Sequence, residues 1–267
     1  MEVLEKVIPY IQGEPVNLYT WSCFHGGTKH CAEKKIIEKV KQVKEDPYGW
    51  WIDLGDKGEF ISPSDPRWDT GVICDWVHQD NIAEDQSQWY MDMVSPILNK
   101  CVGLLWGNHE DAIRIHSHID VHHNICKRLN VADLGNTAFV IFKFQRKNSL
   151  EKHDIQAVFS HGAGWAITKG SKMNRLERFM NSYPRARVAA IGHMHDLITH
   201  TLPYLDVENG RIVDRERVGA VAGCYFKTYS QGIRASYGEK KDYSPTQLGS
   251  PVFSIRPTHN EVTVIGG

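Results

Sequence analysis

Five short apolar runs, each ending abruptly at glycine, histidine or acidic residues, are the feature that most constrains the fold. The run at residues 104–106 is followed directly by Gly107, Asn108, His109 and Glu110. The other runs lie at 17–21 before SCFHG (22–26), at 50–54 before GDKGE (55–59), at 157–159 before SHG (160–162) and at 188–191 before GHMH (192–195). Short apolar runs bounded by glycine are typical of buried strands. We therefore expect five strand ends to converge on one site.

Helical periodicity between these runs predicts a β-loop-α organisation. Residues 31–44 place Ile36, Val40 and Val43 at helical spacing after the first run. We expect strands at 16–21, 50–54, 102–106, 138–146, 155–159 and 188–191, helices at 31–44, 82–98, 110–129 and 172–182, an irregular or edge segment at 1–16, and several short strands beyond 197. This pattern predicts an α/β (α+β) fold, a four-layer αββα sandwich with its active site at the carboxyl ends of strands.

Length and charge narrow the protein class. The 267 residues suit a single domain, which we expect to span 1–267. Residues 60–80 are rich in proline, serine, aspartate and tryptophan without periodicity, so we predict a functional flap there. The net charge of -1 provides no global field that would attract nucleic acid or an anionic membrane, and we expect no membrane partner. The oligomeric state cannot be predicted from these features.

The cysteines indicate a reducing compartment. The six cysteines include no CxxC pair, which argues against a zinc ribbon and against a disulfide framework. Residues 1–10 lack the basic and continuous apolar regions of a secretory signal. We therefore expect a cytoplasmic protein with reduced thiols.

Four of the polar clusters, taken in order, resemble the motifs of the calcineurin-like metallophosphoesterase superfamily. They are GDxxE at 55–59, GNHE at 107–110, HG at 161–162 and GHxH at 192–195. Each motif alone is short, whereas four in this order are specific. The resemblance covers roughly residues 17–230 in architecture. It implies a hydrolase with a binuclear metal centre.

The resemblance also implies the ligands of two metal ions. One ion would be held by Asp56, Asn108, His161 and His193, and the other by Cys23, His25, Asp56 and His195. The two carboxylate oxygens of Asp56 suit it to bridge the ions, and two ions about 3.5 to 4 Å apart would hold the hydroxide that attacks phosphorus. His109 would be the catalytic residue, stabilising the phosphoryl group or protonating the leaving oxygen. No other cofactor is implied.

One position departs from the family pattern. The first motif of the family is DxH, but this chain has Cys23 where the aspartate is expected, two residues before His25. A thiolate is a softer ligand than a carboxylate, so within the candidate ions Mn, Zn and Fe it favours Zn or Fe at this half of the site. The alternative is that Cys23 is a small buried residue and that the first metal binds weakly or is lost.

These observations lead us to expect a metal-dependent phosphoesterase that favours phosphodiesters, with a nucleotide or nucleic acid as substrate. The alternatives are a phosphomonoesterase or phosphoprotein phosphatase, and a non-catalytic scaffold with a degenerate metal site. A basic stretch after residue 168 would either form a nucleic-acid groove or be an ordinary solvated helix. Its members are Lys169, Lys172, Arg175, Arg178, Arg185 and Arg187.

Other features carry weaker signals. His118 and His122 have the i, i+4 spacing that can chelate a metal, but a solvated helix face is the simpler interpretation. Glu59 would either orient neighbouring ligands through hydrogen bonds or be a solvated acid. Arg114 would reach a substrate phosphate or pair with an acid of its own helix. We expect the tyrosines that follow the last motif to pack at a sheet edge rather than line a groove; they are Tyr229, Tyr237 and Tyr243.

Overall fold

Two β-sheets packed face to face form the centre of the molecule in the computed structural model, which describes residues 1–164 and 166–266. The strands are β1 (Glu2–Tyr10), β2 (Val16–Trp21), β3 (Gly49–Asp53), β4 (Cys101–Leu104), β5 (Thr137–Arg146), β6 (Lys152–Ser160), β7 (Val188–Ile191), β8 (Leu197–Glu208), β9 (Arg211–Ala222), β10 (Pro251–Arg256) and β11 (Glu261–Gly266). The α-helices are α1 (Glu33–Glu45), α2 (Ile82–Val94), α3 (Asn108–Ser117), α4 (Val121–Leu129) and α5 (Lys169–Ser182). One sheet has the order β1-β5-β6-β7-β9-β8 and the other β11-β10-β2-β3-β4.

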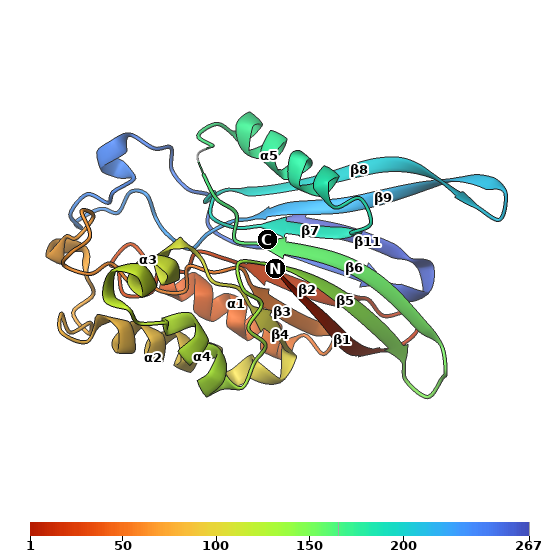
Figure 1. Cartoon of the computed structure of the whole chain (residues 1–267), viewed down its shortest axis with the longest axis horizontal. Coiled ribbons are helices and arrows are strands. Elements are labelled where there is room, and N and C mark those ends of the chain that lie inside the picture. The colour runs from red at the N-terminus through yellow and green to blue at the C-terminus, as the bar shows by residue number, and fades with distance from the viewer. Residues whose placement is uncertain (165, 267) are drawn as a thin grey trace.

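Three apolar clusters define four layers. The central cluster joins the inner faces of the two sheets, with Leu18 and Ile52 from one and Phe142 and Phe159 from the other. A second cluster packs β2, β3 and β4 against α1, α2 and α4, and a third packs β6, β7 and β9 against α5. Figure 1 shows α5 over one sheet and α1, α2 and α4 on the opposite side of the molecule. The predicted αββα sandwich is confirmed.

Strand register explains why distant motifs meet. In the five-stranded sheet β2, β3 and β4 are parallel, and their last residues are paired across the sheet, Trp21 with Asp53 and Asp53 with Leu104. In the six-stranded sheet β6 and β7 are also parallel and end at the paired residues Ser160 and Ile191. The segments that follow these five strands are the five polar clusters of the sequence. Parallel strands present their carboxyl ends at one edge, which is where α/β sheets bind ligands.

The structure corrects two sequence predictions and decides between the alternatives of a third. Residues 110–129 do not form one helix, because His118 adopts the left-handed conformation (φ 56°) that ends α3, and the Asp120 side chain caps the start of α4. Of the two alternatives for segment 1–16, the edge segment is confirmed, since β1 is an edge strand parallel to β5. The strands beyond residue 197 are not all short, because β8 and β9 form a hairpin of two 12-residue strands.

No helix in the described part of the chain has both the length and the apolar character needed to cross a bilayer. The single-domain organisation and the flap at 60–80 stay predictions.

The central layer predicts a stability effect. Phe142 is fully buried between the sheets, and its ring lies 6.5 Å from that of Phe159. Phe142→Ala should lower the free energy of unfolding by about 3 to 5 kcal/mol, because it leaves a cavity that the two sheets cannot close. Urea unfolding followed by circular dichroism measures this change. Val3→Ala, on the exposed face of β1, should change stability by less than about 0.5 kcal/mol; equal losses in both variants would contradict the assigned core.

Candidate metal centre

Backbone strain concentrates at the predicted ligands. Five of the seven adopt positive φ angles although none is glycine: Cys23 (57°), His25 (51°), Asp56 (58°), His193 (66°) and His195 (48°). Such conformations cost of order 1 to 3 kcal/mol each and persist only where the surrounding structure imposes them. They also cluster at functional sites. The strand ends therefore hold these side chains in positions that relaxed loops would not adopt.

Asp56 lies at the junction of two groups of ligating side chains. Within each group the ligating atoms lie within 4.8 Å of one another, and Asp56 belongs to both. The first group adds Cys23, His25 and His195, and the second adds His161 and His193. Burial opposes the charge of Asp56, but His161 and His109 outweigh burial and hold the pKa of Asp56 well below its usual range. The structure thus brings a buried, ionised carboxylate between the two sets.

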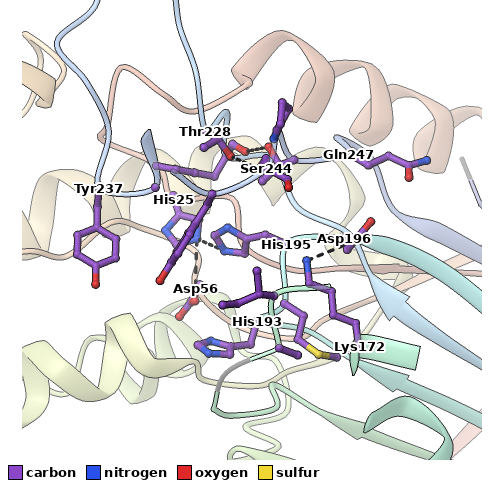
Figure 2. A pocket seen from close by; sticks show the side chains of 18 of the residues that line it. His25, Asp56, Lys172, His193, His195, Asp196, Thr228, Tyr237, Ser244 and Gln247 are labelled. Atoms are coloured by element: carbon purple, nitrogen blue, oxygen red, sulfur yellow. Dashed lines mark hydrogen bonds and ion pairs between the residues drawn. The ribbon is translucent and has the colours of Figure 1, made fainter. Parts of the chain in front are cut away.

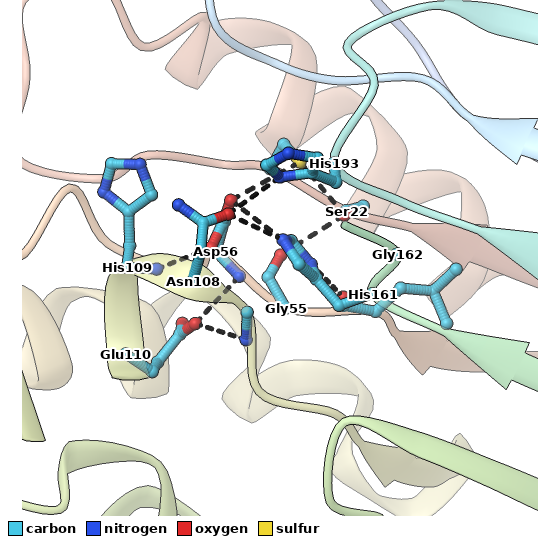
Figure 3. Close-up of polar contacts among 12 residues, drawn as sticks. Ser22, Gly55, Asp56, Asn108, His109, Glu110, His161, Gly162 and His193 are labelled. Atoms are coloured by element: carbon cyan, nitrogen blue, oxygen red, sulfur yellow. Dashed lines mark hydrogen bonds and ion pairs between the residues drawn. The ribbon is translucent and has the colours of Figure 1, made fainter. Parts of the chain in front are cut away.

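Asn108 completes the second group. Its Oδ1 lies 3.1 Å from His161 Nε2 and 2.8 Å from His193 Nδ1 (Figure 3). His161 donates its Nδ1 proton to the carbonyl of Leu54, so its neutral form directs a lone pair from Nε2 at Asp56 Oδ2, 3.2 Å away. Burial alone would lower the pKa of His161, but the charge of Asp56 and its hydrogen bond, together with the Leu54 carbonyl, outweigh burial and raise it. When His161 is neutral, Asp56, Asn108, His161 and His193 offer oxygen and nitrogen lone pairs that fit a metal ion.

The first group contains two facing imidazoles. Glu59 accepts the Nδ1 proton of His25 at 2.9 Å, and the Nε2 atoms of His25 and His195 then lie 3.1 Å apart. At most one proton can sit between two ring nitrogens, whereas a metal ion can accept both lone pairs. Glu59 therefore orients His25, the first of the two roles considered for it.

Cys23 lies in the same group, with its Sγ 3.9 Å from Asp56 Oδ2 and 3.1 Å from Ser22 Oγ. Burial, and then the charge of Asp56, raise the pKa of the Cys23 thiol well above its usual range. The thiol therefore keeps its proton at neutral pH unless a cation replaces it.

His109 is placed differently from the ligands. It lies in the first turn of α3 and donates its Nδ1 proton to the carbonyl of Glu59. Its Nε2 lies 3.4 Å from Arg67 Nη1, and both residues line the same cavity. The imidazole edge is thus available to a bound molecule beside Asn108.

Sequence reasoning missed the role of Glu110. Its carboxylate accepts the backbone N–H groups of Asp56 (3.0 Å), Lys57 (2.7 Å) and Gly107 (2.7 Å), which belong to two different strand-end loops. Beneath it, the buried Lys57 ammonium lies 3.8 Å from Glu110 and 3.9 Å from Asp53. The only sequence signal for Glu110 was its place as the last residue of the GNHE motif. Its role in joining the loops after β3 and β4 follows only from the tertiary structure.

Gly107 shows how closely these loops approach. A Cβ atom on Gly107 would lie 2.2 Å from Asp56 Oδ1 and 2.6 Å from the His161 ring. Gly55, with φ 99°, would meet the backbone of Gly107 in the same way. Only glycine permits this packing at either position.

A cavity of about 890 Å³ opens over the ligands. Arg67 and Tyr237, from two connecting segments, and Lys172, from the start of α5, are among the residues that line it. Figure 2 shows Lys172 and Tyr237 in its wall. Lys172 is paired with Asp196 at 3.3 Å. Of the basic stretch considered for nucleic-acid binding, only Lys169 and Lys172 are among the lining residues. A continuous basic groove does not follow from this arrangement.

The expectation for the tyrosines was wrong in part. Tyr237 and Tyr243 line the cavity, whereas Tyr229 donates its hydroxyl proton to the Tyr243 carbonyl at 2.8 Å. Arg67 was missed altogether, because nothing local in residues 60–80 signals it. Asp65 positions its guanidinium through contacts of 2.7 and 3.0 Å.

Comparisons with known proteins add little to this geometry. No protein-family model and no curated protein matches the chain. One similar solved structure, from Streptococcus pneumoniae TIGR4, is described as a conserved uncharacterized protein and predicted phosphoesterase. It shares 10% sequence identity over 95% of this chain and 98% of its own, with a TM-score of 0.36. A likeness this low carries no argument about function.

The Glu110 contacts predict a large stability effect. Glu110→Gln replaces one acceptor oxygen by an NH₂ group that faces backbone donors, and it leaves the Lys57 charge with Asp53 alone. The free energy of unfolding should fall by about 3 to 5 kcal/mol in urea titrations. The matched control is Asp111→Asn on the same helix, whose solvent-exposed pair with Arg114 should contribute little to stability. Similar losses in both would contradict the role assigned to Glu110.

Proposed function

We propose that this protein is a phosphoesterase that uses two metal ions and favours phosphodiesters. The observation that carries the proposal is the shared, buried Asp56 between two groups of ligating side chains. A shared carboxylate with separate ligands on either side is an arrangement that can hold two metal ions close together, as two-metal hydrolytic catalysis needs. The resemblance of the motifs to metallophosphoesterases supports the same activity.

Each ion would be held by one of the two groups of ligating side chains, with Asp56 shared between them. The first group is Cys23, His25 and His195, and the second is Asn108, His161 and His193. A bound metal pair supplies Lewis acidity toward phosphoryl oxygens and a lowered pKa for a water nucleophile. The oxygen-containing second set suits Mn, Fe or Zn, whereas the thiolate of Cys23 favours Zn or Fe in the first.

His109 and Arg67 would act on the substrate. The Glu59 carbonyl holds the Nδ1 proton of His109, so a second proton must enter at Nε2, where it can pass to the leaving oxygen of an ester. The Arg67 guanidinium, beside Nε2, would stabilise the negative charge of the phosphoryl group. Asp65 keeps this guanidinium in place, which reduces the entropy lost when substrate binds.

The preference for diesters rests on the motif resemblance and on the size of the cavity. A cavity of about 890 Å³ is larger than a phosphate group needs, and aromatic Tyr237 in its wall suits an organic substituent such as a nucleobase. A nucleotide or nucleic acid end is therefore the proposed substrate class. We also propose a cytoplasmic location, with which the six free thiols are consistent.

The activity is tested with bis(p-nitrophenyl) phosphate and p-nitrophenyl phosphate, using chelator-stripped protein resupplied with Mn or Zn. We expect metal-dependent cleavage of the diester, reduced at least about 100-fold in Asp56→Ala and in His109→Ala. His116→Ala, on the exposed face of α3, is the control and should retain activity. Faster cleavage of the monoester would favour a phosphatase. Absence of both turnover and bound metal would favour a non-catalytic scaffold.

The departure at Cys23 gives a separate prediction. Cys23→Asp replaces the thiolate by a hard carboxylate, so after dialysis against equal Mn and Zn the bound Mn:Zn ratio should rise several-fold. Elemental analysis of the dialysed protein measures this ratio. Cys101→Ala removes a buried thiol of β4 that belongs to neither ligand group and should leave the ratio unchanged. An unchanged ratio in Cys23→Asp would show that position 23 does not bind metal.

A further inference from the structure

A third group of ligating side chains lies on α4 and the segment that follows it. His122 and Cys126 are four residues apart, so both point from the same face of the helix, and each is 3% exposed. Asp133 approaches them from the next segment. None of the three belongs to the centre around Asp56. The prediction that His122 lies on a solvated face is therefore wrong, and His118, which ends α3, is not its helical partner.

The ligating atoms of this group converge on one point. His122 Nε2 lies 2.9 Å from Asp133 Oδ1 and 3.5 Å from Cys126 Sγ, and all three atoms lie within 4.8 Å of one another. Zn–N bonds of about 2.1 Å and Zn–S bonds of about 2.3 Å place tetrahedral ligands roughly 3.3 to 3.8 Å apart. The contact to Cys126 already has this length. The contact to Asp133, whose side chain is 38% exposed, needs to open by only about 0.5 Å.

A fourth ligand is within reach. His123 Nδ1 lies 3.7 Å from Asp133 Oδ2, and its side chain is 64% exposed, so it can turn toward the group without disturbing the core. The four side chains would give a mixed set of nitrogen, sulfur and oxygen ligands. Such a set suits zinc and is too soft for magnesium or calcium.

The charges of these ligands can balance those of a divalent cation. Burial, and then the nearby Lys57, lower the pKa of His122, so the imidazole is neutral, which is the form that coordinates metals. Asp133 is ionised. Burial raises the pKa of Cys126 to about 12, so zinc binding must release the thiol proton to solvent. One thiolate and one carboxylate then neutralise the two positive charges of the ion.

We propose that His122, Cys126 and Asp133, with His123, form a structural zinc site. The zinc would tie α4 to residues 131–136, which support the end of β4. In that segment the carbonyl of Ala132 accepts the Leu104 N–H at 3.0 Å, and the carbonyl of Gly135 accepts the Trp106 N–H at 2.9 Å. These contacts lie immediately before Gly107 and Asn108. The zinc site would therefore stabilise the end of β4, which carries Gly107 and Asn108 of the candidate metal centre, without contacting a substrate.

Cobalt(II) titration of the full chain tests the proposal, because cobalt reports thiolate ligation by a charge-transfer absorption band. Cys23→Ala is the starting variant, since it removes the other thiol predicted to bind metal. The band should persist in Cys23→Ala, disappear in Cys23→Ala/Cys126→Ala, and remain in the matched control Cys23→Ala/Cys101→Ala. Zinc should abolish the band by displacement. The rise in Tm on adding zinc should be larger in Cys23→Ala than in Cys23→Ala/Cys126→Ala, because both variants keep the remaining ligands of the candidate metal centre and differ only at the proposed zinc site.

A milder variant covers the case in which loss of Cys126 impairs folding. In the unchanged protein Asp133 Oδ1 accepts the Gly135 N–H at 3.0 Å. Asp133→Asn keeps an oxygen that can accept this N–H group, but it removes the charged ligand. In the Cys23→Ala background it should weaken cobalt binding roughly tenfold or more. A natively folded Cys23→Ala protein with no thiolate band, or unchanged affinity in Asp133→Asn, would overturn the proposal. Neither result depends on hydrolytic activity, so failure here leaves the proposed function intact.

Discussion

The carboxylate of Glu110 is the contact on which the candidate centre depends. By accepting three N–H groups it fixes the loop after β3 to the loop after β4, and so fixes Asp56 beside Asn108. Burial opposes the charge of Glu110, but the Lys57 charge and the backbone N–H groups of Lys57 and Gly107 together outweigh burial and lower the pKa of this carboxyl. A neutral side chain could not satisfy all three donors. The strained backbone of Asp56 persists because this ionic contact restrains it.

Much of the arrangement could be predicted from the sequence, for one physical reason. Parallel strands end at a common edge, so apolar runs that stop at His161 and His193 indicate by their pattern alone that these side chains meet. The αββα layers followed from the alternation of strands and helices. What could not be predicted depends on tertiary placement or on single local conformations. Arg67 is brought to His109 by a loop without periodicity, and one left-handed residue, His118, divides a helical pattern that otherwise continues.

The two halves of the centre differ in chemical character. The half with Asn108 and His161 presents amide and imidazole groups to Asp56, whereas the other half presents a buried thiol. In the half that contains the thiol, the backbones of both Cys23 and His25 have positive φ angles. This strain indicates that the loop after β2 holds the Cys23 sulfur near Asp56. Because the two halves would prefer different metal ions, the order in which they bind metal would depend on the concentrations of those ions.

The cavity walls have a different origin from its floor. The ligands follow directly from strand ends and are locked by ion pairs and glycine contacts, whereas Arg67, Lys172 and Tyr237 come from connecting segments or a helix start. Connecting segments tolerate changes of length and composition that strand ends do not. Selection acting on the walls alone could therefore change which molecule the cavity binds while the candidate metal centre stayed constant. Divergence among proteins of this architecture would then be concentrated in the segments around residues 67, 168 and 237.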